Sequence, residues 1–199
     1  MNALKKERTK NVLKYTWPIY IVTTIAVIAV MSFIFNATHQ TPAYKTLTLF
    51  ISGESKDTKK LKDDLLKKFE DKELKSVSTI IANPNEGHYY SKLSIPGFNS
   101  ADILIIPISK LDNLQISSFG LDLSNELITS YYDGYTLYQQ DEANYGIKLN
   151  KEKVKEYVTL PSEDCYMILN GKSENLGKYS LTSDEAHDNA LQIVKDWGI

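Results

Sequence analysis

The chain has 199 residues, enough for about one domain. Its 42% apolar and 24% charged residues are typical of a globular protein and exclude a disordered, collagen-like or disulfide-rich chain. The formal net charge of −2 conceals an uneven distribution, because basic residues are concentrated at the N-terminus.

The first predicted element is an apolar run at residues 19–35, which contains no charged residue. With its flanking residues it reaches about the 20 residues that a helix needs to cross ~30 Å of hydrocarbon. Five basic residues and one acidic residue precede it. Because cationic flanks stay in the cytoplasm, we predict a cytoplasmic N-terminus and an extracytoplasmic remainder. The predicted segments are a basic tail (1–15), a transmembrane anchor (16–36), a linker (37–45) and an extracytoplasmic α/β domain (46–199).

A cleaved signal peptide is the competing interpretation of the N-terminus, because a basic start and an apolar run are typical of one as well. Against it, the run exceeds the usual ~7–15 residues and no convincing small-x-small cleavage site follows. A buried core helix is disfavoured, because so apolar a run has no polar face. We therefore expect an uncleaved, single-pass anchor in a cell membrane.

The part of the chain after residue 36 is acidic, with 18 basic and 24 acidic residues and a net charge of −6. This charge argues against a nucleic-acid partner and against lying flat on an anionic bilayer. Cys165 is the single cysteine, so the chain can form no internal disulfide. An exported domain of this size without disulfides is more typical of a bacterium than of a eukaryotic secretory pathway.

Strands and helices alternate in the first half of the domain. A short β-branched run predicts a strand over Thr46–Ser52, and apolar residues at four-residue spacing predict an amphipathic helix over 55–72. We then expect a strand at 76–83, a short helix at 87–93 ended by residues 95–97, and a fully buried strand at 101–107. This order predicts an α/β fold, with a mostly parallel sheet flanked by helices.

The second half is less regular. Its predicted helices are 109–115, 123–132, 151–157 and 182–197, and its predicted strands are 135–139, 145–150 and 165–170. Thr182 and Glu185 have the spacing of a capping box at the start of the last helix. The apolar stripe of that helix consists of Ala186, Ala190, Ile193, Val194 and Trp197.

Several stretches resemble one family. They are TLTLFISGES, YYSKLSIPGFNSADILIIP, YGIKLN, and CYMILNGKSENLG followed by SDEAHDNALQIVKDW. They resemble extracellular solute-binding proteins of ABC importers, in the sugar-binding branch, with Lys148 where proline is usual. The resemblance implies a two-lobed clamp, but only 154 residues follow residue 45, so we expect one lobe. A helical anchor also departs from the lipid-modified cysteine that is usual in Gram-positive members.

No motif predicts catalysis, a metal or a cofactor. The DEAHD string at 184–188 lacks a phosphate-binding GxxxxGK[ST] loop, so it is better explained as acidic residues at a helix start. His39, His88 and His187 are far apart in sequence, although folding could still assemble a metal site. Cys165 lies in an apolar run, where a thiol is usually inert. We expect no enzyme activity.

Tyrosines are the most suggestive feature of the domain. Five of them, Tyr131, Tyr132, Tyr135, Tyr138 and Tyr145, fall within 15 residues, and Tyr89 and Tyr90 form a pair. Tyrosine suits sugar stacking or a protein interface, although β-propensity in a tyrosine-rich chain explains the run equally simply.

Ligands of open α/β sheets bind beyond the carboxyl ends of the strands, which by analogy of fold points to the loops after residues 52 and 83. The predicted ligand-binding residues are Ser52, Glu54, Asn85, Tyr89, Tyr131 and Tyr135.

The sequence therefore predicts a membrane-anchored, non-enzymatic binding or accessory domain. Its expected partners are the membrane, a transporter or other envelope protein, and a sugar or peptide ligand. The alternative is a structural or assembly subunit of a bacterial envelope complex, whose helix pairs with other membrane helices. A hydrolase with an unrecognised site is the third hypothesis.

Overall fold

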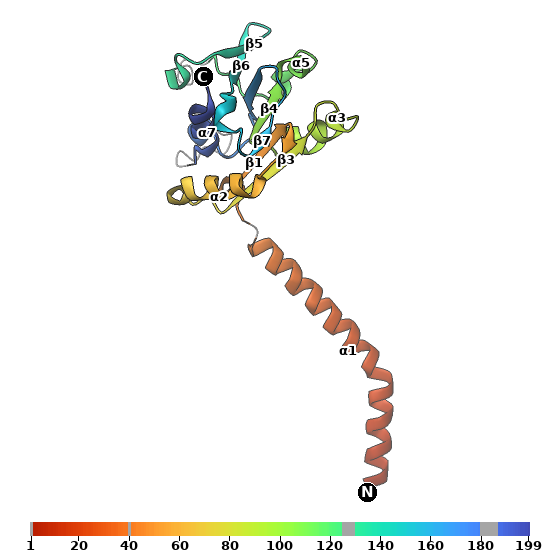
Figure 1. Cartoon of the computed structure of the whole chain (residues 1–199). Coiled ribbons are helices and arrows are strands. Elements are labelled where there is room, and N and C mark those ends of the chain that lie inside the picture. The colour runs from red at the N-terminus through yellow and green to blue at the C-terminus, as the bar shows by residue number, and fades with distance from the viewer. Residues whose placement is uncertain (1, 40, 125–129, 180–186) are drawn as a thin grey trace. The chain divides into compact units, whose positions relative to one another are not determined.

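The computed structural model describes residues 2–39, 41–124, 130–179 and 187–199 (Figure 1). The chain divides into two compact units, Met1–Thr41 and Pro42–Ile199.

The first unit is helix α1 (Asn2–His39). Its Thr16–Phe35 segment has a mean hydropathy of 2.3 and none of it is buried, so α1 is long and apolar enough to span a membrane. A signal sequence meets the same criteria. The Thr23 and Thr24 hydroxyls donate to the carbonyls of Ile19 and Tyr20, at 2.8 and 2.7 Å, so the helix itself satisfies these two polar groups.

The second unit is built on a six-stranded sheet with the order β3-β1-β4-β8-β6-β5. Its strands are β1 (Thr46–Ser52), β3 (Ser76–Ala82), β4 (Ile103–Pro107), β5 (Leu137–Gln140), β6 (Ala143–Lys148) and β8 (Cys165–Leu169). β1 pairs in parallel with β3 and β4, and the remaining ladders are antiparallel. Four of the six strands thus run in one direction, which confirms the predicted α/β fold with a mostly parallel sheet.

One of the antiparallel ladders, between β5 and β6, follows from a tight turn. β5 and β6 are joined at Asp141 and Glu142, which have φ values of 50° and 67°. Two consecutive left-handed residues form the two-residue turn that matches the twist of a hairpin, so these strands must lie antiparallel. The hairpin confirms the two predicted strands, each displaced by one or two residues.

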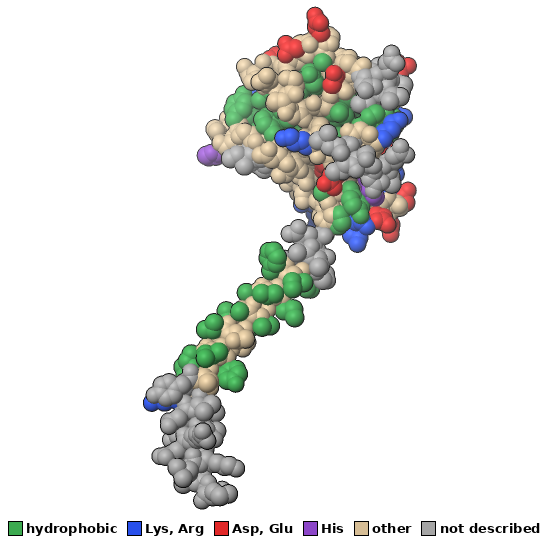
Figure 2. Space-filling view, turned by 180° about the vertical axis from the view of Figure 1, so that it is seen from behind, with side chains coloured by type: hydrophobic (Ala, Val, Ile, Leu, Met, Phe, Trp, Pro, Cys, Tyr) green, Lys and Arg blue, Asp and Glu red, His purple; other side chains and the backbone are tan. Residues whose placement is uncertain are grey.

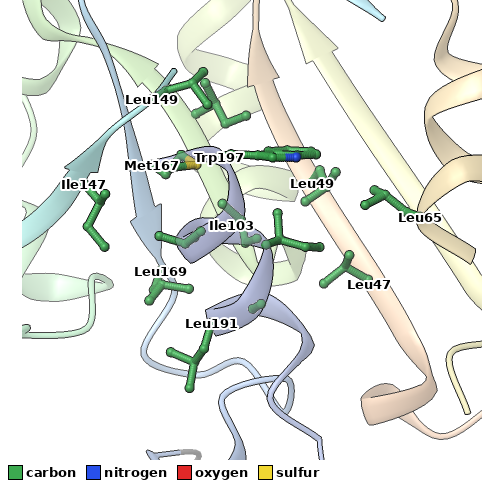
Figure 3. Packing of buried hydrophobic residues seen from close by; sticks show 14 of the residues in the cluster. Leu47, Leu49, Leu65, Ile103, Ile147, Leu149, Met167, Leu169, Leu191 and Trp197 are labelled. Carbon is green, nitrogen blue, oxygen red and sulfur yellow. The ribbon is translucent and has the colours of Figure 1, made fainter. Parts of the chain in front are cut away.

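Helices cover both faces of the sheet (Figure 1). One face packs against α2 (Thr58–Lys68) and α7 (Asn189–Trp197), and Figure 3 shows Leu65, Leu191 and Trp197 meeting the strand residues there. The other face packs against α3 (Tyr89–Lys92) and α5 (Ile108–Leu111). Every residue of β4 and β8 is buried, as expected of strands covered on both faces.

Helix α2 is shorter than its predicted range. The Asp57 carboxylate accepts the Lys60 N–H at 2.9 Å and starts the helix there. Leu61, Leu65 and Phe69 are buried, which confirms the predicted apolar stripe. Ser55 belongs instead to β2 (Glu54–Ser55), which pairs with β7 (Val158–Thr159).

The predicted end of the short helix at residues 95–97 is wrong. After α3 the chain continues through a π-helical turn, Leu93–Gly97, into α4 (Phe98–Ser100). Proline lacks only its own N–H, and a π turn changes which backbone groups pair, so Pro96 does not end the helical path.

Two other predicted helices are reduced. The 109–115 helix is α5, which ends at Leu111, and the 151–157 helix is only a 3-10 turn, Lys151–Lys153. Residues 125–129 of the predicted 123–132 helix and the capping pair Thr182 and Glu185 lie outside the described residues. In α7 the described members of the predicted stripe, Ala190, Ile193, Val194 and Trp197, are all buried.

Candidate functional site

Two predicted site residues, Ser52 and Tyr89, contact each other beneath the surface. The Ser52 Oγ lies 2.8 Å from the Tyr89 hydroxyl, and the two residues are 0% and 1% exposed. Burial raises the pKa of Tyr89 to about 12, so its hydroxyl is neutral. This buried hydrogen bond joins the end of β1 to α3, so it stabilises the loops around it.

Glu54 and Asn85 lie at the surface beside this pair and are joined through Asn83. The Asn83 side-chain amide donates to Glu54 Oε1 at 2.9 Å, and Asn83 Oδ1 accepts the Asn85 N–H at 3.0 Å. The loops after β1 and β3 are therefore brought together, as parallel neighbours require. Sequence reasoning left Asn83 out of the site, although its place directly after a strand was a signal.

The carboxyl end of β1 is covered by another part of the chain. A Cβ atom built on Gly53 would lie 2.4 Å from the Thr159 carbonyl oxygen, and the Lys56 and Asp57 N–H groups both donate to the Tyr157 carbonyl at 3.0 Å. We call residues 155–159 the covering segment. It occupies the position where the fold analogy places a ligand.

We expect Gly53→Ala to lower the free energy of unfolding by about 1–3 kcal/mol, because the new methyl group must displace the backbone carbonyl of Thr159. Urea denaturation measures the loss. Gly87→Ala is the matched control, since nothing lies within 4 Å of a Cβ at Gly87. Equal stability of the two variants would show that the covering segment does not pack closely on Gly53.

Tyr131 and Tyr135 lie elsewhere, beside α7. They line an open groove of about 570 Å³ together with Lys68, Gln192, Lys195 and Asp196. The Tyr135 hydroxyl donates to the Lys195 carbonyl at 2.8 Å, and the Lys195 Nζ lies 4.5 Å from the centroid of the Tyr131 ring. The groove thus combines aromatic rings with amide and charged groups. The predicted site residues therefore divide between two places.

The run of tyrosines does not form one surface. Tyr132 is buried beside Tyr131 and donates to the Leu191 carbonyl at 3.1 Å. Tyr138 and Tyr145 pack on the opposite face of the sheet. There the Tyr138 hydroxyl donates to the Asp112 carboxylate at 2.9 Å, and burial, with that bond, raises the pKa of Tyr138 to about 12. Sequence spacing alone could not assign these residues to faces.

Among the described residues, no three His, Cys, Asp or Glu side chains gather in a way that could hold a metal ion. His187 is buried and its ring stacks on Tyr44, with ring centroids 4.2 Å apart. Asp188 forms an ion pair with Lys72. His187 and Asp188, the last two residues of the DEAHD string, are therefore engaged in ring stacking and in an ion pair. Residues 184–186 lie outside the described residues.

Cys165 is expected to be unreactive in the folded protein. It is buried in β8, and burial raises the pKa of its thiol to about 11, which leaves almost no thiolate at neutral pH. A chromogenic disulfide reagent should therefore modify less than a tenth of the protein within an hour in native buffer, and modify it fully in 6 M guanidinium. Rapid modification of the folded protein would contradict the assignment of Cys165 as a core residue.

Comparisons with known proteins give a likeness of fold. No protein-family model matches the chain, and no curated protein sequence does. One similar solved structure is the maltose/maltodextrin-binding domain MalE from Bdellovibrio bacteriovorus bound to maltotriose, with 14% identity and a TM-score of 0.39, covering 58% of this chain and 33% of that one.

Two further structures are comparable. RafE from Streptococcus pneumoniae has 21% identity and a TM-score of 0.36, over 59% of this chain and 33% of that one. The ABC substrate-binding protein Lmo0181 from Listeria monocytogenes, in complex with cycloalternan, has 15% identity and a TM-score of 0.33, over 56% and 32%. The chain spans about one third of the length of each structure.

Proposed function

We propose that this chain is a membrane-anchored binding or accessory domain on the outer side of a cell membrane, and that it is not an enzyme. The observation that carries the proposal is an apolar 20-residue helical segment, Thr16–Phe35, attached to a separately packed α/β domain. Five basic residues in front of this segment favour a cytoplasmic N-terminus.

The groove beside α7 supports a binding role. Tyr131 and Tyr135 offer aromatic surface, while Gln192, Lys195 and Asp196 offer donors and acceptors. This mixture of a few polar groups and aromatic rings suits a saccharide, whose ring faces stack and whose hydroxyls form hydrogen bonds. The exposed Glu54 and Asn85 provide a second polar surface at the carboxyl edge of the sheet.

The proposal of a non-enzymatic role rests on what the buried reactive groups contact. The Tyr89 hydroxyl is engaged with Ser52, and the Cys165 Sγ donates to the Glu163 carbonyl at 3.7 Å. The buried Asp102 carboxylate accepts the Thr48 N–H at 2.6 Å. Each of these groups therefore has a structural partner, and none of the three opens into a described groove.

A thermal-shift titration of the detergent-solubilised full chain tests the binding role. With maltotriose as probe we expect the midpoint to rise by about 5–11 °C at 100 times the dissociation constant, where binding contributes about 2.7 kcal/mol. Tyr131→Ala should remove the rise and Tyr90→Ala should retain it. No rise with maltotriose or with a panel of other oligosaccharides would exclude saccharide binding.

An assembly subunit, whose helix pairs with other membrane helices, remains the second candidate. Replacing residues 19–35 with an unrelated apolar span distinguishes the binding domain from the assembly subunit. A binding domain would keep its thermal shift and its membrane location, whereas an assembly subunit would lose its co-purifying membrane complex. The Thr23 and Thr24 hydroxyls bond within α1, which makes them weak candidates for pairing helices and ranks this function second.

A further inference from the structure

Strand β3 is one edge of the six-stranded sheet, and its seven residues all pair with β1 on the inner side. The Gly53 N–H donates to the Ala82 carbonyl at 2.9 Å, so Ala82 turns its backbone groups towards β1. Because the direction alternates along a strand, Val77, Thr79 and Ile81 turn their N–H and C=O groups outward. Among the described residues, none forms a hydrogen bond with these outward groups.

The two edges of the sheet differ in the features that prevent pairing with another chain. β5, at the opposite edge, has four residues, an irregular register between Tyr138 and Gln139, and the acidic Asp141 and Glu142 directly after it. Short length, a bulge and charge are the usual means of keeping an edge unpaired. β3 has seven residues in unbroken register and contains no charged residue, proline or glycine. Only the β3 edge is therefore suited to accept a further strand.

The side chains of β3 are incompletely covered. Ile80 and Ile81 are half-buried on opposite faces of the sheet, whereas their partners in β1, Phe50 and Ile51, are buried. Figure 2 shows that hydrophobic side chains do reach the surface of the domain. A strand added beside β3 would cover Ile80 on one face and Ile81 on the other. Burial of apolar surface would thus add to the main-chain hydrogen bonds of such a pairing.

The sequence of β3 is complementary to a second copy of itself. In an antiparallel pair centred on Thr79, Val77 lies opposite Ile81 and Ser78 lies opposite Ile80. The residues with outward backbone groups then oppose one another, as an antiparallel ladder requires, and form about six hydrogen bonds. Directly opposed residues share a face, so two Val–Ile pairs flank a central Thr–Thr pair. No like charges meet, because the strand carries no charge.

We propose that two copies of this chain associate through β3, with the two β3 strands antiparallel and Thr79 at the two-fold axis. The two sheets then form one continuous sheet. Because the β5 edges resist pairing, the association closes at a dimer and does not continue into a fibre. A second copy is favoured over an unrelated strand because each residue of β3 meets a compatible residue of its own sequence. The inference is independent of the groove beside α7.

Disulfide formation between copies of the full chain, in detergent and in proteoliposomes, tests the pairing and its register. Opposed residues of a non-hydrogen-bonded antiparallel pair have Cα atoms ~4.5 Å apart, within reach of a disulfide, whereas diagonal neighbours lie ~7–8 Å apart. A mixture of Ser78→Cys and Ile80→Cys should therefore form at least about fivefold more covalent dimer than either variant alone. The native Cys165 is buried, so it does not compete.

Gln139→Cys is the matched control for collisional cross-linking, because Gln139 is an exposed residue of the β5 edge. It should form no more covalent dimer than Ser78→Cys alone. Equal cross-linking of the mixture and of the single variants would overturn the proposed register. Binding of another protein's strand along β3, with no covalent dimer from the mixture, would overturn the choice of a second copy.

Opposite charges at the two-fold axis keep the test independent of folding. Thr79→Lys and Thr79→Glu should each weaken self-association about fivefold, because each places like charges opposite one another. An equimolar mixture of the two should restore it, a gain that misfolded variants cannot show. Sedimentation equilibrium in density-matched detergent measures the association. A monomeric wild type, or a dimer that neither charge weakens, would overturn the inference. The maltotriose shift is measured separately and is expected in either case.

Discussion

Replacing Asp102 with alanine is expected to lower the free energy of unfolding by about 3–5 kcal/mol, because it leaves buried donors without an acceptor. The Asp102 carboxylate accepts the Thr48 N–H at 2.6 Å, the Asn175 amide at 3.2 Å and the Ser173 hydroxyl. Asn175 also donates to the Thr46 carbonyl at 2.9 Å. One buried carboxylate therefore joins β1, the start of β4 and the loop before α7.

Urea denaturation of the wild type and the Asp102→Ala variant measures this loss. Asp102→Asn should lose less, because the amide retains one acceptor oxygen. Asp71→Ala is the control, since Asp71 is an exposed acidic residue of the same domain. A loss below about 1 kcal/mol, the worth of a single ordinary hydrogen bond, would show that Asp102 does not organise this end of the sheet.

The stability contributed by Asp102 should also depend on pH. Burial, which outweighs the hydrogen bonds it accepts, raises the pKa of the Asp102 carboxyl. A carboxyl with a higher pKa in the folded state binds more protons when folded, so its contribution increases as the pH falls towards the unfolded value of about 3.9. The stability difference between the wild type and Asp102→Asn should therefore widen as the pH falls from neutral towards that unfolded value.

Exposed carboxylates change in the opposite direction and serve as the internal comparison. Hydrogen bonding to Lys45 lowers the pKa of Glu73, and hydrogen bonding to Lys60 lowers the pKa of Glu156. Their contributions are present at neutral pH and are lost as the pH falls through these lowered values. As the pH falls, the difference in free energy of unfolding between the wild type and Glu73→Gln should thus narrow, while the difference between the wild type and Asp102→Asn widens. A narrowing of both would refute the raised pKa of Asp102.

Two lysines in the middle of the apolar segment should abolish membrane anchoring. Each lysine at the centre of a spanning helix costs about 2.5–3.5 kcal/mol of insertion free energy, so Ile25→Lys with Ala29→Lys opposes insertion by about 5–7 kcal/mol. We expect the wild type to stay in the pellet after alkaline carbonate extraction and the double variant to leave it. Ile25→Leu with Ala29→Leu is the matched control and should remain in the pellet.

The same preparation distinguishes an anchor from a cleaved signal peptide. Mass spectrometry of the membrane-bound protein should find residues 1–36 intact, and external protease should digest the domain while sparing the N-terminal tail. Retention of the double-lysine variant in the pellet would show that α1 is not the anchor. A mature N-terminus beyond residue 36 would establish cleavage.

Local patterns account for the features that the sequence predicted correctly. The spacing of Leu61, Leu65 and Phe69 identifies α2, and the apolar runs of β1 and β4 identify the central strands. Both the helical spacing and the apolar run are properties of a short stretch of chain, so they can be recognised without the tertiary structure. The sequence also predicted that the loops after β1 and β3 lie together, since neighbouring parallel strands end at the same edge of a sheet.

The sequence by itself thus determined an apolar helix, an acidic α/β domain and the loops at one edge of its sheet. Only the tertiary structure decided that Tyr131 and Tyr138 lie on opposite faces, that the covering segment fills the end of β1, and that Asp102 joins three parts of the chain. Gly53 and Thr159 are about a hundred residues apart. No local period encodes such a contact, because it arises only when distant segments compete to bury the same surface.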